Sequence, residues 1–212
     1  VRGDQLRGGD GTSIVDTSDD TKLTYYTPRF SGFQAGYSFV PHSGANGSVS
    51  TTGAGSGPGH EAAVEWRGDV GGGNLRATAS YVLLDAADNG GAGPDDLDAW
   101  AVGAVYEFGP YSAGAGYVDQ GRRRGTAEQT AWDASVGYNG GKWEVALTYM
   151  KAEADFSTGA DESYHQWWLG GAYNLGGGLS LLAGLYLWDL DARTPTNDND
   201  GQTLVIGINA EF

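Results

Sequence analysis

The segment Ile206-Gly-Ile-Asn-Ala-Glu-Phe212 ends the chain as an alternation of apolar residues with polar or small ones. Successive side chains of a β-strand point to opposite faces, so this pattern predicts a strand. Traced back to position 203, one face carries Leu204, Ile206, Ile208, Ala210 and Phe212. The opposite face carries Thr203, Val205, Gly207, Asn209 and Glu211. The first face suits lipid and the second suits water.

The composition limits the class of protein. The 212 residues carry a formal net charge of −15 and have a mean hydropathy of −0.37, although 40% of them are hydrophobic. No apolar run approaches the ~18 residues of a transmembrane helix. Apolar residues hidden by alternation fit a membrane barrel, and also a soluble all-β protein. The negative charge argues against a nucleic-acid partner and favours cations.

The ends and the cysteine content add little more. The chain contains no Cys and does not begin with Met, and no secretory signal is visible at its start. We therefore expect a mature or truncated chain.

Eleven segments have the alternation and length of strands. They cover 22–27, 33–40, 61–68, 74–84, 98–108, 111–119, 130–138, 142–151, 164–174, 179–189 and 202–212. Most run about nine to eleven residues, the length that crosses a bilayer at a barrel tilt. Strands of soluble sandwiches typically have about five or six residues. The lengths therefore favour a transmembrane β-barrel.

The connections between these segments alternate in size. Short turns rich in Gly or Pro cover 28–31, 69–73, 109–110, 139–141 and 175–178. Long polar loops cover 41–60, 85–96, 120–129, 152–163 and 190–201. This order is typical of an up-and-down antiparallel barrel with short periplasmic turns and long external loops. A terminal aromatic residue on the last strand, at the side of the short turns, is also typical of bacterial outer-membrane barrels.

The side chains divide into an outward apolar set and an inward polar set. The predicted lipid-facing residues are Trp100, Val102, Ala104, Tyr106 and Phe108 on one strand, Trp143, Val145, Leu147 and Tyr149 on another, and Leu179, Leu181, Ala183, Leu185 and Leu187 on a third. The predicted inward residues include Gln34, Ser38, Arg67, Arg76, Thr78, Ser80, Asp133, Ser135, Lys142, Glu144 and Asn174. Unpaired buried charges are costly, so we expect the inward face to line water.

Aromatic residues gather near both ends of the strands. One group, near the short turns, contains Phe33, Phe108, Tyr111, Tyr138, Trp143, Tyr173 and Phe212. The other, near the long loops, contains Tyr81, Trp100, Tyr117, Trp132, Tyr149, Trp167 and Trp188. Two such groups around an aliphatic middle predict the aromatic girdles of a membrane barrel.

Three segments resemble Gram-negative general porins, in particular those of alphaproteobacteria. Residues 23–39 (LTYYTPRFSGFQAGYSF) resemble the strand–turn–strand that follows the constriction loop of that family. Residues 169–179 (LGGAYNLGGGL) and 205–212 (VIGINAEF) resemble its closing hairpin and last strand. The resemblance implies a homotrimer of sixteen-stranded barrels in the outer membrane of a Gram-negative bacterium. It also implies passive diffusion of small hydrophilic solutes and ions, in contact with membrane lipid and lipopolysaccharide.

By this resemblance, the eleven strands correspond to strands six to sixteen of the family, so we expect about five strands to be missing. Residues 1–20 are then the tail of the inward-folded constriction loop, and residues 21–212 supply the barrel strands. The acids implied at the constriction are Asp10, Asp16, Asp19 and Asp20. Basic residues on the wall would be Arg67 and Arg76, with Lys22 and Lys142 as weaker candidates. The net charge favours weak cation selectivity.

Other interpretations remain open at this level. A twelve-stranded barrel would use residues 1–15 as a further strand. Oxygen-rich segments with Asp95 and Asp98, and with Asp198 and Asp200, have the ligand type that Ca²⁺ prefers in external loops. The run Arg122-Arg123-Arg124 suits lipopolysaccharide phosphates.

A catalytic function has weak support in the sequence. The histidines are His42, His60 and His165, and neither a G-x-S-x-G nor an H-E-x-x-H motif occurs. We therefore expect neither an enzyme nor a cofactor. A barrel enzyme and a soluble all-β binding protein stay as rival classes.

Overall fold

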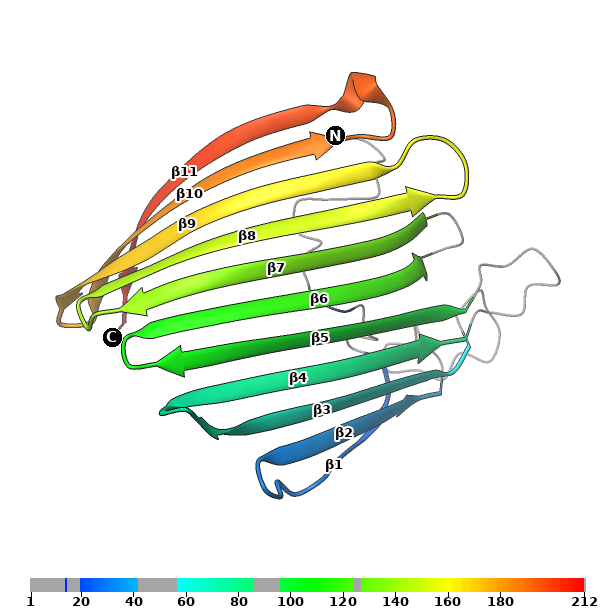
Figure 1. Cartoon of the computed structure of the whole chain (residues 1–212), viewed down its shortest axis with the longest axis horizontal. Helices are drawn as coiled ribbons and strands as arrows, with labels where there is room; N and C mark the ends of the chain where they lie inside the picture. The colour runs from blue at the N-terminus through cyan, green and yellow to red at the C-terminus, as the bar shows by residue number, and fades with distance from the viewer. Residues whose placement is uncertain (1–13, 15–19, 42–56, 86–95, 124–126, 212) are drawn as a thin grey trace.

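The computed structural model of the chain describes residues 14, 20–41, 57–85, 96–123 and 127–211. These residues form one antiparallel sheet of eleven strands, in which every strand pairs with its neighbours in the sequence (Figure 1). The strands are β1 (Leu23–Tyr26), β2 (Phe33–Val40), β3 (Gly59–Val70), β4 (Gly73–Leu84), β5 (Leu97–Phe108), β6 (Tyr111–Arg123), β7 (Ala127–Asn139), β8 (Trp143–Phe156), β9 (Glu162–Gly176), β10 (Leu179–Asp191) and β11 (Asn199–Ala210). The sheet curves into a wall with β1 and β11 at its edges.

The predicted antiparallel up-and-down order is confirmed, and each of the eleven predicted strands is present. The only helical element of the described residues is the short 3₁₀ turn η1 (Pro195–Asn197), which precedes β11. Among the described residues, no helix has the length and apolar character needed to cross a membrane.

Several strands extend further into the predicted long loops than expected. β6 continues to Arg123, β8 continues to Phe156 and β9 begins at Glu162. The ladder persists there, with Arg123 opposite Ala127 and Ala127 opposite Phe156. The predicted loops 120–129 and 152–163 are therefore wrong over most of their length. In these segments the backbone pairing continues although the outward side chains are polar. That polarity is the reason why the sequence predicted loops there.

A bulge at Gly121 lets the hairpin of β6 and β7 bend. The register shifts between Asp119 and Arg122, and Gly121 has a φ of +59°. Its backbone N–H donates to Oδ1 of Asp119 at 2.9 Å. A side chain at this position would collide with the carbonyl of Asp98 on β5. Glycine is thus required both by the left-handed backbone and by the close neighbour.

Glycine pairs close two of the short turns. Gly71 and Gly72 have φ values of +59° and +85°, and Gly177 and Gly178 have values of +63° and +81°. Left-handed conformation at both central residues matches the twist of a two-residue hairpin. These turns therefore hold neighbouring strands in register at the same end of the sheet.

The turn before β10 gives a stability prediction with a built-in control. Both Gly177→Ala and Gly178→Ala should lose about 1–2 kcal/mol from the left-handed backbone. Gly178→Ala should lose a further ~1–3 kcal/mol because its Cβ would collide with the Glu211 carbonyl, whereas nothing lies within 4 Å at Gly177. Urea unfolding in lipid vesicles measures both variants. Equal losses would show that the contact with Glu211 does not constrain the turn.

Candidate functional site on the concave face

Strand register sorts the side chains into two faces. Residues in register with Trp100 form the outer face, which also carries Leu147 and Leu185. The inner face carries the alternate residues, among them Glu65, Arg76 and Trp168. The predicted division between the two faces is confirmed for the strand residues. The one predicted inward residue outside the strands is Lys142, which lies in the turn before β8.

The outer face is apolar and exposed. On β11, Leu204, Ile206 and Ile208 have 67%, 74% and 71% of their surface exposed. Such a continuous apolar surface in contact with water would be unusual for a soluble protein. The observed surface is that of a wall lying in lipid, with its polar groups on the other side.

Rings on the outer face form two bands, as predicted. Toward the long loops, Trp132 and Tyr149 have ring centroids 5.1 Å apart, and Tyr149 and Trp167 4.7 Å apart. Toward the short turns, the centroids of Trp143 and Tyr173 are 4.4 Å apart. Amphipathic rings at both ends of an apolar band are typical of the two membrane interfaces.

The prediction that Trp188 belongs to the aromatic band near the long loops is wrong. Trp188 pairs with Gln166 on β9 and Gly201 on β11, and these residues belong to the inner face. It packs there against an apolar cluster. Its neighbours Leu187 and Asp189 point outward instead, so a ring near the end of a strand was not sufficient to assign its face.

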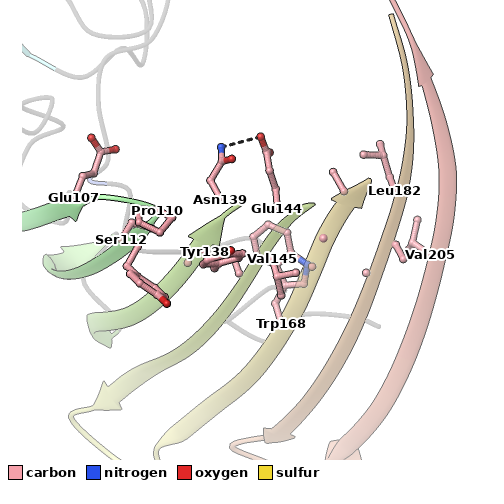
Figure 2. A pocket seen from close by; sticks show the side chains of 18 of the residues that line it. Glu107, Pro110, Ser112, Tyr138, Asn139, Glu144, Val145, Trp168, Leu182 and Val205 are labelled. Atoms are coloured by element: carbon pink, nitrogen blue, oxygen red, sulfur yellow. Dashed lines mark hydrogen bonds between the residues drawn. The ribbon is translucent and has the colours of Figure 1, made fainter. Parts of the chain in front are cut away.

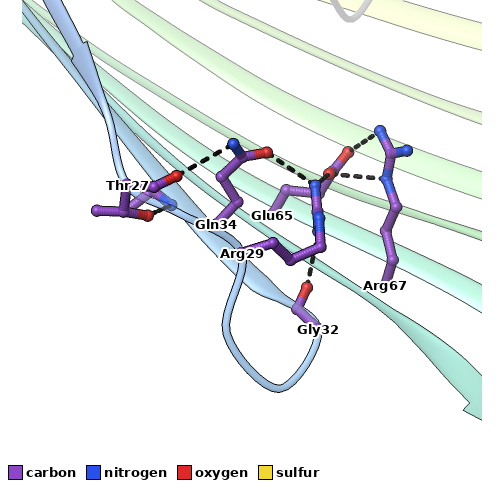
Figure 3. Close-up of polar contacts among 7 residues, drawn as sticks. Thr27, Arg29, Gly32, Gln34, Glu65 and Arg67 are labelled. Carbon is purple, nitrogen blue, oxygen red and sulfur yellow. Dashed lines mark hydrogen bonds and ion pairs between the residues drawn. The ribbon is translucent and has the colours of Figure 1, made fainter.

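An ion-pair network lies on the inner face beside the turn between β1 and β2 (Figure 3). Oε1 of Glu65 accepts from Nη2 of Arg29 at 2.6 Å and lies 2.7 Å from Nε of Arg67. Oε2 accepts from Nη2 of Arg67 at 2.8 Å, which completes a two-pronged contact. Arg29 also donates to Gln34 Oε1 and to the Gly32 carbonyl, each at 2.8 Å. One carboxylate therefore holds two guanidinium groups at the wall.

The predicted basic residues Arg67 and Arg76 are direct cross-strand partners on β3 and β4. Arg76 also lines a hollow of about 450 Å³ with Glu65, Asp133 and Ile14. Like charges placed opposite each other repel, and Glu65 provides the compensating charge. The structure thus brings these two arginines together and adds Arg29. Sequence analysis missed Arg29 because it lies in a predicted turn.

The remaining predicted constriction residues are placed less centrally. Nζ of Lys22 lies 3.2 Å from Oε2 of Glu61 on the inner side of β3. Lys142 is exposed at the short-turn rim. Asp20 precedes β1 and is partly buried. Asp10, Asp16 and Asp19 lie outside the described residues, so their roles stay predictions.

The inner face is dry near the long-loop end. Val118, Ala131, Ala152, Tyr164 and Leu190 form a buried cluster there, against which Ile14 packs. The expectation that the whole inner face lines water is therefore wrong at this end. Small alanines on several strands leave room for an apolar residue from the N-terminal segment.

A second unexpected feature is aromatic. Trp168 and Tyr186 lie on the inner face with parallel rings, 5° apart in plane and with centroids separated by 5.7 Å. A sequence signal for this was present. Adjacent strand residues face opposite sides, so either Trp167 or Trp168 had to point inward.

The predicted calcium ligands do not converge in the described part of the chain. Asp198 Oδ1 accepts from the Ala192 backbone N–H at 2.9 Å, and Asp200 pairs with Asp189 across the outer face. Asp98 is the second residue of β5, and Asp95 lies outside the described residues. Among the described residues, no three His, Asp or Glu side chains gather as a metal site. Calcium binding stays a prediction.

The two described histidines each contact a tyrosine on the outer face. Nδ1 of His60 lies 2.6 Å from the Tyr37 hydroxyl, and Nδ1 of His165 lies 2.7 Å from that of Tyr149. His42 lies outside the described residues. Neither pair faces the hollow side of the wall, where a solute would be held.

Comparisons with known proteins agree with this geometry. Residues 3–192 match the family described as Gram-negative porin. A search of curated proteins found no match. Among solved structures, the chain is similar to the anion-selective porin from Comamonas acidovorans, with 23% identity and a TM-score of 0.58. That alignment covers 89% of this chain and 58% of the porin.

Two further structures share the fold. A porin refined at 1.8 Å resolution has 21% identity and a TM-score of 0.61, over 92% of this chain and 62% of that one. OmpT of Vibrio cholerae, an outer membrane protein studied with loop L8 deleted, has 16% identity and a TM-score of 0.66. That match covers 97% of this chain and 68% of OmpT. The chain spans about three fifths of the length of the first two porins.

The curved antiparallel wall, with lipid on one side and charged groups on the other, defines an outer-membrane barrel protein. The chain belongs to the Gram-negative porin family, a family of non-enzymatic outer-membrane channels. The predicted outer-membrane location is confirmed, and the soluble and enzymatic alternatives are wrong.

Proposed function

We propose that this chain contributes the wall of a water-filled channel through which small hydrophilic solutes and ions diffuse passively, with a weak preference for cations. The observation that carries this proposal is the unequal charge of the inner face. Seven strand carboxylates face inward: Glu61, Glu65, Asp69, Glu107, Asp133, Glu144 and Glu162. Among the strand cations whose side chains the structure describes, Arg67 and Arg76 face inward.

Cations outside the strands reduce this difference without reversing it. Lys22, Arg29 and Lys142 lie beside the inner wall and raise the basic groups to five against seven acids. The bases lie mostly near β1–β4, whereas Glu107, Asp133, Glu144 and Glu162 lie on β5–β9. A field across the lumen from such a separation would orient permeating dipoles and favour cations overall.

Residues 1–20 are proposed to fold inward as part of a constriction. Ile14 supports this, because it packs against the inner apolar cluster and lines the hollow beside Arg76. A segment anchored at Ile14 would carry Asp10, Asp16, Asp19 and Asp20 close to the wall cations. Residues 21–212 would then supply the transmembrane barrel strands with their long external loops.

The assembly is proposed to be a homotrimer in contact with lipid and lipopolysaccharide. The exposed aliphatic side of β11 supplies apolar surface for lipid or a neighbouring copy. Arg122 and Arg123 end β6 at the long-loop side, where lipopolysaccharide phosphates are located. Calcium bound by the loop acids would bridge the same phosphates, and removing calcium with a chelator should then weaken lipopolysaccharide retention.

The channel is tested by single-channel recording of the native detergent-purified protein in planar bilayers. Under a KCl gradient, we expect conductance steps in groups of three and a reversal potential of cation-selective sign. The name of the Comamonas porin records the opposite selectivity. An anion-selective sign would overturn the charge proposal, and the absence of steps from protein of verified full mass would overturn the channel.

A further inference from the structure

A hollow of about 800 Å³ lies on the inner face near the short turns, between the ends of β5 and β11 (Figure 2). This size falls in the range of small-molecule sites, about 300–1,000 Å³. Its wall comes from the seven neighbouring strands β5 to β11 and includes Glu107, Glu144, Trp168, Leu182, Tyr186 and Val205. Figure 2 shows these strands curving around the hollow, with Glu107 at one side of its wall and Leu182 and Val205 at the other.

The rings of Trp168 and Tyr186 form a flat apolar platform on this wall. They are parallel, and 40% of the surface of Trp168 is exposed. Glycine makes the flat position available, since a Cβ at Gly170 would lie 2.9 Å from Nε1 of Trp168. A Cβ at Gly184 would lie 3.4 Å from each of the two rings. The indole therefore lies along the wall and presents its π face to the hollow.

The charged groups of the hollow are carboxylates. Glu107 and Glu144 both line it, and none of its described lining residues is basic. Asn139 Nδ2 donates to Oε1 of Glu144 at 3.0 Å, which holds that side chain at the rim and leaves Oε2 as an acceptor. On β8, Ala146 is opposite Gly170, the residue under the indole. Glu144 is the neighbouring inner-face residue on the same strand, toward the short turn.

We infer that this hollow is a binding site for organic cations with a planar apolar body, such as arylalkyl ammonium ions. The aromatic platform would take the ring, and attraction to the π face and to Glu144 would hold the ammonium group. An anion of the same shape would meet two carboxylates and no cation. The inference deepens the proposed channel by naming a solute class, and it rests on the inner face being accessible to water.

Binding is tested directly with the native protein in detergent, by titration calorimetry with phenethylammonium at low salt. Trp168→Leu should raise the Kd of phenethylammonium about tenfold, as expected for loss of a cation–π contact and of ring stacking. The matched control is Trp167→Leu, because Trp167 precedes it on β9 and faces outward. An equal effect of both substitutions, or no effect of either, would overturn the site.

The charge requirement is tested with a neutral analogue and a conservative variant. 2-Phenylethanol has the same ring and chain, and should bind at least about fivefold more weakly than phenethylammonium. Glu144→Gln should weaken the cation by about threefold or more and leave the alcohol unchanged, with a smaller effect at high salt. Equal binding of the two compounds would make the hollow an apolar site and overturn the assignment to cations.

Calorimetry separates this site from the channel itself. A bilayer recording in which phenethylammonium blocks the wild-type current, but blocks the Trp168→Leu current about tenfold more weakly, would support both proposals. Normal conductance without block or binding would overturn the site alone. Binding without any conductance would leave the site standing and overturn the channel.

Discussion

Replacing Leu185 with arginine is expected to lower the free energy of unfolding by about 2–4 kcal/mol, the cost of a cation near the middle of a bilayer. Leu185 lies on the outer face, with Leu169 and Leu204 as its register partners. It lies between Leu187, which is opposite Trp167 of one aromatic band, and Leu181, which is opposite Tyr173 of the other, so a guanidinium there has little access to water. Urea unfolding of the protein in lipid vesicles measures the change.

Leu182→Arg is the matched control on the same strand. Leu182 faces the hollow on the inner side and has 41% of its surface exposed, close to the 37% of Leu185. In water the two substitutions would have similar effects. In lipid, only Leu185→Arg should be costly, and Leu182→Arg should change stability by less than ~1 kcal/mol. Equal costs would contradict the assignment of the two faces.

Glu65→Gln is expected to shift ion selectivity toward anions. Glu65 holds Arg29 and Arg67, and Arg76 lies opposite Arg67 on the next strand. Removing its charge leaves three guanidinium groups at this part of the wall without a shared carboxylate. Lumen potentials are on the order of a few kT, so loss of one charge should lower the cation-to-anion permeability ratio by about two- to threefold. Reversal potentials under a KCl gradient measure the ratio.

Asp189→Asn removes the same charge from the other side of the wall. Asp189 pairs with His165 and Asp200 on the outer face. Selectivity should stay at the wild-type value in this variant, because the charge lies outside the lumen. A shift in Asp189→Asn equal to that in Glu65→Gln would mean that net charge alone, and not its position on the wall, sets selectivity.

The sequence predicted the fold well because the β-period is so regular here. Alternation along β5, β8 and β10 assigns the faces without further information, and glycine pairs such as Gly177-Gly178 mark the hairpin turns. Strand ends were less predictable. Beyond the aromatic bands, hairpins such as β6–β7 continue with polar side chains on their outer side, where hydropathy no longer distinguishes a strand from a loop.

The functional surface was only partly predictable for geometric reasons. Arg67 and Arg76 were expected on the inner wall, but their direct opposition depends on the register of β3 and β4. Arg29 reaches Glu65 from a turn, over 36 positions of sequence separation. The platform of Trp168 and Tyr186 depends on which of two adjacent tryptophans points inward. The packing of Ile14 depends on a contact between segments that are distant in the sequence.

The central claim is that one face of this wall contacts water in a lumen and the other contacts lipid. The sequence contains no Cys, so single cysteines at positions 181–185 of β10 can be labelled in intact outer membranes with a charged, water-soluble thiol reagent. We predict labelling at 182 and 184 and protection at 181, 183 and 185. Uniform labelling, or labelling of the odd positions instead, would contradict the account.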